Sequence, residues 1–141
     1  MPIAFHKEGV DFEMPNESKL GNWLVDIAAS KNKIISQIAY IFCDDEFLLN
    51  INKEYLNHDY YTDIITFPYK QGSEIESDIF ISIDRITENA ITYKSSFEKE
   101  LLRVMAHGLL HLLGYMDKTD DEIKLMRDKE NWAIDMFYNH V

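Results

Sequence analysis

The sequence "SSFEKELLRVMAHGLLHLLGYMDKTDDE", residues 95–122, carries the strongest structural signals in the chain. Apolar side chains recur at helical spacing through residues 101–113, and Ser95 stands three residues before a glutamate, which is the spacing of a capping box. Gly114 then supplies the residue type that most often ends a helix in the left-handed conformation. The stretch therefore predicts a buried helix that starts near Ser95 or Ser96 and ends at about residue 113.

The remaining apolar patterns predict four more helices and three strands. One helical pattern follows the capping residue Asn16 or Ser18, and a second follows Asp44 or Asp45. A third pattern starts at Asp84, and a fourth runs from the capping residue Thr119 or Asp120 to residue 140. Runs of β-branched and aromatic residues predict strands at 34–45, 62–69 and 77–83, the last two most simply an antiparallel pair. Because strands and helices do not alternate strictly, we expect an α+β fold, with a small mixed sheet of about four strands packed against several helices.

Length and composition indicate one globular domain, residues 1–141, with 46% apolar and 13% aromatic residues. No apolar run approaches the roughly 18–20 residues that a membrane span needs, and the N-terminus lacks the order of a signal peptide. The single cysteine, Cys43, lies in an apolar stretch and is expected to be an inert buried thiol. These features predict a cytoplasmic protein that does not act at membranes.

The formal net charge of −11 argues against a large, non-specific basic surface of the kind that holds nucleic-acid backbones. An acidic total can still contain a local basic patch, so an RNA substrate is compatible with this charge. An acidic surface would also suit docking onto a basic protein.

Two histidines of the quoted stretch, His107 and His111, are four residues apart and so lie one turn apart on the same helix face. Asp117 follows six residues after His111, beyond the glycine turn. Two imidazole nitrogens and a carboxylate oxygen would leave the fourth position of a tetrahedral zinc ion open, which is typical of a catalytic site. From spacing alone, a pair of core histidines with an aspartate in a turn explains the pattern equally well.

The residue beside the first histidine separates this pattern from the common zinc peptidases. In the motif H-E-x-x-H, a glutamate next to the first histidine acts as the general base. Gly108 occupies that position here. A peptidase of that kind is therefore disfavoured.

The segment from His107 to Asp117 resembles the motif H-G-x-L-H-L-x-G-Y-D-H of the YbeY endoribonucleases, also described as rRNA maturation factors. It departs from the motif only at Met116 and Asp117 among the specified positions. A second signature of that family, T-D-V-L-S-F-P, is similar to "TDIITFP" at residues 62–68. The resemblance covers about residues 40–135, and the two motifs occur in the expected order and spacing.

This resemblance implies a single-strand-specific endoribonuclease that uses a zinc-activated water, with one zinc held by His107, His111 and Asp117. It further implies a role in rRNA maturation at the 3′ end of the small-subunit rRNA and in ribosome quality control. The expected partners are rRNA and the small ribosomal subunit or its proteins; DNA is not expected. Asp117 stands where the family has its third histidine, and a carboxylate is an acceptable zinc ligand there.

Substrate contacts are less well marked in the sequence. The family tends to carry an arginine in the loop before its second signature, and Leu56 occupies that place, with His58 two residues later. His58, Lys70 and Arg85 are candidate phosphate contacts, each with an ordinary surface residue as the alternative reading. Asp63 is a candidate for orienting a metal-ligating histidine, or for holding the adjoining loop.

Two other functions fit parts of the sequence. One is a ribosome-assembly factor with a mainly structural zinc, which the acidic charge would suit. The other is a metal-dependent hydrolase of a different substrate, such as a peptide or an ester, against which Gly108 speaks.

Overall fold

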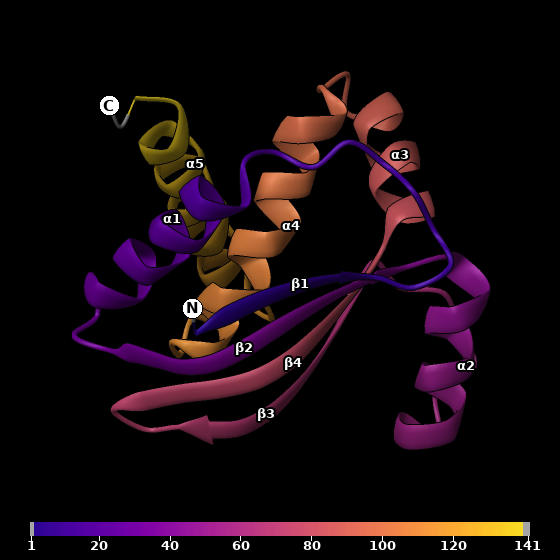
Figure 1. The fold of residues 1–141 in the computed structure, drawn as a ribbon, viewed down its shortest axis with the longest axis horizontal. Helices are drawn as coiled ribbons and strands as arrows, with labels where there is room; N and C mark the ends of the chain where they lie inside the picture. The colour runs from indigo at the N-terminus through magenta and orange to yellow at the C-terminus, as the bar shows by residue number, and fades with distance from the viewer. Residues whose placement is uncertain (1, 140–141) are drawn as a thin grey trace.

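A computed structural model describes residues 2–139 and shows one four-stranded mixed sheet with helices packed on it (Figure 1). The strands are β1 (Ile3–Lys7), β2 (Ile34–Cys43), β3 (Ile64–Gln71) and β4 (Glu74–Ser82), in the spatial order β1-β2-β4-β3. β1 and β4 both run parallel to β2, whereas β3 pairs antiparallel with β4. The predicted α+β class, the mixed sheet and the antiparallel pair are confirmed.

Five helices lie within residues 2–139: α1 (Glu17–Ala29), α2 (Asp45–Leu56), α3 (Ile83–Thr92), α4 (Phe97–Leu112) and α5 (Asp120–Asn139). α1, α4 and α5 lie together over one face of the sheet, with α3 beside α4 (Figure 1). α2 stands apart from them, next to the C-terminal end of β2, from which it continues. The predicted last helix is confirmed as α5; its expected final residue, His140, lies outside the described residues.

The helix starts follow the expected capping chemistry, with one correction. Asn16 and Asp44 cap α1 and α2 by accepting from backbone N–H groups of the first turn. At α4 the N-cap is Ser96, whose side chain accepts from the N–H of Lys99, so Ser95 is not the cap. The capping-box spacing of Ser95 and Glu98 is therefore not used, because the third residue after the Ser96 cap is Lys99.

The strand β1 is the element that sequence patterns missed. It is five residues long, and within residues 2–139 it pairs only with β2, which begins more than twenty residues later in the sequence. A short edge strand with a distant parallel partner has neither a hairpin turn nor a long alternating pattern to mark it.

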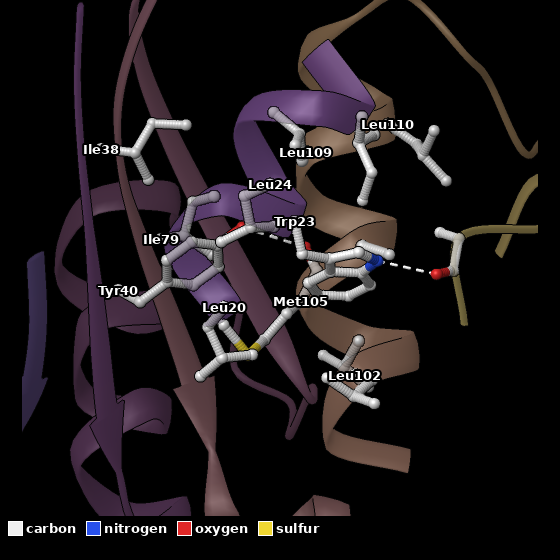
Figure 2. Packing of buried hydrophobic residues seen from close by; sticks show 14 of the residues in the cluster. Leu20, Trp23, Leu24, Ile38, Tyr40, Ile79, Leu102, Met105, Leu109 and Leu110 are labelled. Carbon is white, nitrogen blue, oxygen red and sulfur yellow. Dashed lines mark hydrogen bonds between the residues drawn. The ribbon is translucent and has the colours of Figure 1, made fainter. Parts of the chain in front are cut away.

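The main hydrophobic core lies between the sheet and the helix layer formed by α1, α4 and α5 (Figure 2). Two large aromatic side chains in this core donate hydrogen bonds from their polar atoms to backbone carbonyls. The Tyr40 hydroxyl donates to the carbonyl of Met105 over 3.1 Å, and Trp23 Nε1 donates to the carbonyl of Ala133 over 2.7 Å. These bonds join β2 to α4 and α1 to α5, so they tie α4 to the sheet and the two neighbouring helices to each other.

A smaller cluster forms where α2 packs on the sheet. Cys43, Leu48, Ile51 and Ile65 are buried there, with Phe67 and Phe80 packed against them. Burial, with a smaller contribution from neighbouring carboxylates, raises the pKa of the Cys43 thiol to about 12. The thiol is therefore unreactive at neutral pH, as its apolar surroundings in the sequence predicted.

α4 lies closest to the sheet at Gly108. A Cβ at this position would lie 2.8 Å from Cδ1 of Ile64 and 3.5 Å from Cγ2 of Ile79. Glycine therefore allows the helix to approach strands β3 and β4 in the middle of the segment that carries the two histidines.

Among residues 2–139, no helix combines the length and the apolar character required to span a bilayer.

The close approach at Gly108 can be tested by a pair of substitutions. We expect Gly108→Ala to change the free energy of unfolding by less than about 0.5 kcal/mol, because the gain in helix propensity is offset by displacement of Ile64. In an Ile64→Val background, which lacks Cδ1, the same substitution should stabilise the protein by about 1 kcal/mol. Urea denaturation of both pairs measures the difference. Equal effects in the two backgrounds would contradict this packing.

Candidate metal centre

The C-terminal half of α4 and the turn after it bring His107, His111 and Asp117 together. One ligand-type atom from each of the three side chains lies within 4.8 Å of the others. Asp117 Oδ2 lies 3.2 Å from His111 Nε2 and 3.5 Å from His107 Nε2. Donors about 2.0–2.1 Å from a tetrahedral zinc ion are separated by about 3.3 Å, so these two distances match the edges of such a site. The three side chains thus form a potential metal-binding group.

The turn that returns Asp117 to the helix depends on backbone hydrogen bonding at the end of α4. Gly114 has a φ of 106°, and the N–H of Tyr115 donates to the carbonyl of Leu110 over 3.0 Å. This is the left-handed helix end that the glycine predicted. A capping box closes the other side of the turn: Thr119 and Glu122 each accept from the other's backbone N–H, over 3.1 and 2.9 Å. Asp117 is therefore held between two ordered helix ends.

The ring of His107 is oriented by Glu130, a residue of α5. The Nδ1–H of His107 donates to Oε2 of Glu130 over 2.7 Å, which leaves Nε2 free to face Asp117. Burial lowers the pKa of the His107 imidazole, but the hydrogen bond and charge of Glu130, helped by Asp63 and Asp117, raise it more, so the net pKa lies above its ordinary value. A carboxylate behind a ligand histidine fixes the tautomer that metal binding needs.

Glu130 is itself held in place by a buried ion pair. Its side chain is 6% exposed, and Oε1 accepts from Nη1 of Arg103 over 3.1 Å. Arg103 in turn contacts Asn131 over 2.9 Å. The sequence did not identify Glu130 because it lies 23 residues after His107 on another helix. A usable signal was present, since a carboxylate interrupts the apolar face that Met126 and Ala133 form on α5.

Asp63 lies at the entrance of β3, beside this group. It lines a cavity of about 170 Å³ together with His107, Glu130 and Glu100. Burial raises the pKa of the Asp63 carboxyl, and attraction to His107 opposes that rise. Glu130, and not Asp63, makes the hydrogen bond that orients His107. The Asp63 backbone carbonyl accepts from the N–H of Ser82 over 3.0 Å and ties the loop to β4.

The structure does not gather the three candidate phosphate contacts around the metal group. His58 lies just after α2, where its ring stacks on Tyr60 and its Nδ1 lies 3.0 Å from the Tyr60 hydroxyl. Lys70 is exposed on β3, opposite Glu76 in the ladder. Phosphate binding by these residues stays a prediction.

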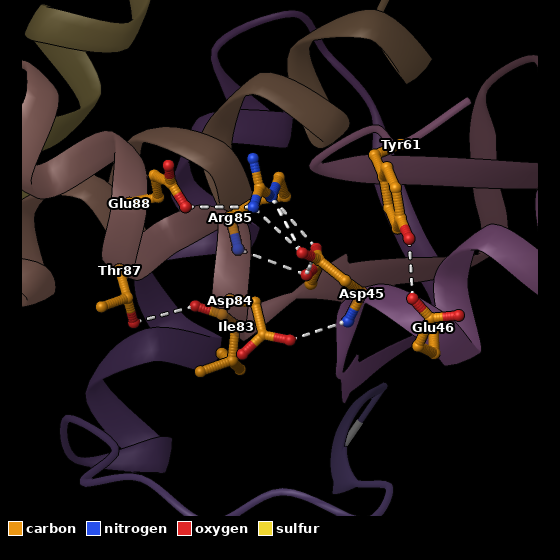
Figure 3. Close-up of polar contacts among 9 residues, drawn as sticks. Asp45, Glu46, Tyr61, Ile83, Asp84, Arg85, Thr87 and Glu88 are labelled. Carbon is orange, nitrogen blue, oxygen red and sulfur yellow. Dashed lines mark hydrogen bonds and ion pairs between the residues drawn. The ribbon is translucent and has the colours of Figure 1, made fainter.

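Arg85 has a structural role that its sequence context did not reveal. Its guanidinium pairs with Asp45 over 3.0 Å and with Glu88 over 3.1 Å, and Asp45 also accepts from the hydroxyl of Ser82 (Figure 3). These contacts join the start of α3 to the start of α2. A phosphate could engage Arg85 only in competition with the two carboxylates.

Comparison with known proteins gives a consistent result. The family model described as "Endoribonuclease YbeY" matches residues 3–137. The chain is 50% identical to Endoribonuclease YbeY of Flavobacterium psychrophilum over 136 residues, which covers 96% of each protein. It is 51% identical to Endoribonuclease YbeY of Flavobacterium johnsoniae, over 96% of this chain and 97% of that protein.

A solved structure agrees with the fold. The solution structure of TM1509 from Thermotoga maritima matches with a TM-score of 0.67 and 26% sequence identity, over 96% of this chain and 89% of that one. Together with the match of the family model over almost the whole length, these likenesses show that the chain belongs to the YbeY endoribonuclease family.

Proposed function

We propose that the protein is a zinc-dependent endoribonuclease that cleaves single-stranded RNA and acts in rRNA maturation. The family provides the reaction class. The observation that supports the metal dependence is the arrangement of His107, His111 and Asp117, in which the Asp117 oxygen lies 3.2 and 3.5 Å from the two Nε2 atoms, close to the donor separations of a tetrahedral zinc site. Three protein ligands leave one position for water or substrate.

The composition of the group favours a catalytic over a structural zinc. Structural sites usually have four protein ligands. Within residues 2–139 the group of potential ligands contains three residues, and Asp117 is 39% exposed, so the site opens to solvent. When bound, zinc would lower the pKa of a water ligand towards 7 and withdraw negative charge from a phosphate oxygen.

The chain's own residues hold this site in a fixed geometry. Glu130 accepts the Nδ1–H of His107, so the lone pair of the neutral imidazole lies on Nε2, which is directed towards Asp117. Arg103 fixes Glu130 and balances part of its charge. Asp117 brings one negative charge to the site in place of a neutral imidazole, so the loaded centre is less positive than one with three histidines.

Gly108 bears on the choice of substrate. Its position faces the sheet, where a Cβ would lie 2.8 Å from Cδ1 of Ile64, so a glutamate could be accommodated only by displacing the isoleucine side chains. α4 therefore lacks the general base that zinc peptidases carry beside the first histidine. A phosphodiester substrate fits this site better than a peptide.

The biological setting belongs to the same proposal. We expect the substrate to include small-subunit rRNA near its 3′ end, the partners to be the small ribosomal subunit or its proteins, and the location to be the cytoplasm. Comparison of small-subunit rRNA 3′ ends in cells that express the wild type or His111→Ala tests this role. Unchanged ends in the variant would exclude it.

Removal of a ligand histidine should abolish both metal binding and cleavage. We expect His111→Ala to weaken zinc binding by more than about 100-fold, since even changes behind the ligands reduce affinity up to about that much. Elemental analysis after dialysis measures bound zinc, and single-stranded and duplex RNA oligonucleotides measure cleavage.

His6→Ala is the matched control for this experiment, because His6 is exposed on β1. It should retain one zinc and full activity. Full zinc content in His111→Ala would refute the metal group, whereas zinc-dependent cleavage of duplex and single strand at equal rates would refute the strand specificity.

Glu130→Gln isolates the contribution of the carboxylate behind His107. The amide oxygen can still accept the Nδ1–H, but the negative charge is lost, so we expect zinc affinity to fall by about 10- to 100-fold. Competition with a chromogenic chelator measures the affinity. Glu54→Gln, an exposed position on α2, should leave it unchanged. Equal affinities of Glu130→Gln and the wild type would show that the buried carboxylate does not tune the site.

A further inference from the structure

A second cavity adjoins the one at the metal group and has an unusual charge. It measures about 440 Å³ and lies where the turn between α3 and α4 meets α5. Four cationic side chains and one carboxylate line it: Lys94, Lys99, Arg103, Arg127 and Glu100. The whole chain has 14 basic and 25 acidic residues. This cavity therefore reverses the sign of charge that prevails in the protein, as a binding site for an anion would.

The two cavities share part of their walls, and three carboxylates, Asp63, Glu100 and Glu130, line the inner one. Tyr93, Glu100, Arg103 and Arg127 line both of them, and the inner cavity ends at His107. Lys99 precedes His107 by eight residues on α4, a distance of about 12 Å along the helix. We call the path from Lys94 and Lys99 to His107 the α4 groove. A ligand that fills it must be extended and must carry negative charge away from the metal group.

The charges of the α4 groove differ in how far they are already neutralised. Arg103 pairs with Glu130 over 3.1 Å, and Arg127 lies 4.0 Å from the same carboxylate. Within residues 2–139, neither Lys94 nor Lys99 has an ion-pair partner within 4.0 Å, and both are exposed. The outer end thus presents two uncompensated ammonium groups to a ligand.

An aromatic ring completes the groove. Tyr93 is 66% exposed and contributes to the wall of both cavities. Cationic side chains beside an exposed aromatic ring, as the outer cavity presents them, are the arrangement by which proteins hold single-stranded nucleic acid, since the cations follow the backbone and a base stacks on the ring.

We propose that the α4 groove binds the single-stranded RNA backbone on one side of the scissile bond, with phosphates at Lys94 and Lys99 and a base stacked on Tyr93. The assignment rests on the proposed ribonuclease function for its substrate class. It places RNA binding on the α3–α4 side of the metal group, in addition to any contact from the loop that contains His58. It also explains how an acidic protein can hold a polyanion.

The test measures binding without cleavage. Fluorescence anisotropy in the presence of chelator gives the affinity for RNA strands of about 4 and about 12 nucleotides across a series of salt concentrations. The charge variant is Lys94→Asn/Lys99→Gln; asparagine is chosen because Lys94 has a φ of 54°, a left-handed conformation that asparagine tolerates. The matched control is Lys19→Gln/Lys33→Gln, which removes two positive charges on and just after α1, across α4 from α3 (Figure 1).

Loss of two phosphate contacts should make the slope of log affinity against log salt shallower by about 1.4, at about 0.7 per contact for a single strand. The effect should be confined to the longer RNA, since the short strand can avoid the outer cavity. Tyr93→Leu should weaken binding of the longer RNA by about tenfold with no change in slope, because stacking releases no counterions. The control should keep the wild-type slope and affinity.

Several results would overturn the proposal: a charge variant with the wild-type slope, a control with an equal loss, or a wild type that does not bind the longer RNA. Failure of the ribonuclease function gives a different pattern. In that case the α4 groove variants lose RNA binding, while zinc-loaded wild type leaves the bound RNA intact. Retained zinc-dependent cleavage with unaltered binding in the charge variant would refute the α4 groove and leave the nuclease function in place.

Discussion

The packing of α4 against both the sheet and α5 is the constraint on which the site depends. The helix is buried along most of its length, yet His107 and His111 remain at its edge with part of each ring accessible. Gly108 sets the distance to β3 and β4, and the Tyr40 hydroxyl anchors the backbone of Met105 just before the first histidine. Metal-ligating side chains on a rigid helix lose little conformational freedom on binding, which favours a preorganised site.

Helix α5 contributes the carboxylate that orients one of the ligand histidines. Glu130 and Arg103 form an ion pair between α5 and α4, and the second carboxylate oxygen of Glu130 accepts the hydrogen bond that orients His107. A buried carboxylate with both oxygens hydrogen-bonded avoids the penalty of an unpaired charge. The same arginine then borders the α4 groove, so one side chain links the orientation of a ligand histidine to the surface where we place RNA.

Local sequence signals predicted what is locally determined. The glycine turn and the capping box after it act over a few residues, and these interactions bring Asp117 back to the two histidines. The β1 strand, Glu130 and the α4 groove were not predicted, because each depends on partners distant in sequence. Arg85 shows the converse: its position near a strand end suggested a ligand contact, but Asp45, 40 residues earlier, occupies its guanidinium. Spacing alone could not distinguish a free cation from one already paired across the fold.

The contact of Gly108 with the sheet also limits how this protein can change over evolutionary time. The one place on α4 where a proton acceptor would convert the helix into that of a zinc peptidase is closed by the isoleucines of β3 and β4. Acquisition of that chemistry would require the side chains of Ile64 and Ile79 to move or to become smaller before the glutamate could be accommodated. The hydrophobic interior therefore restricts the reactions that are accessible to the site, although it touches neither metal nor substrate.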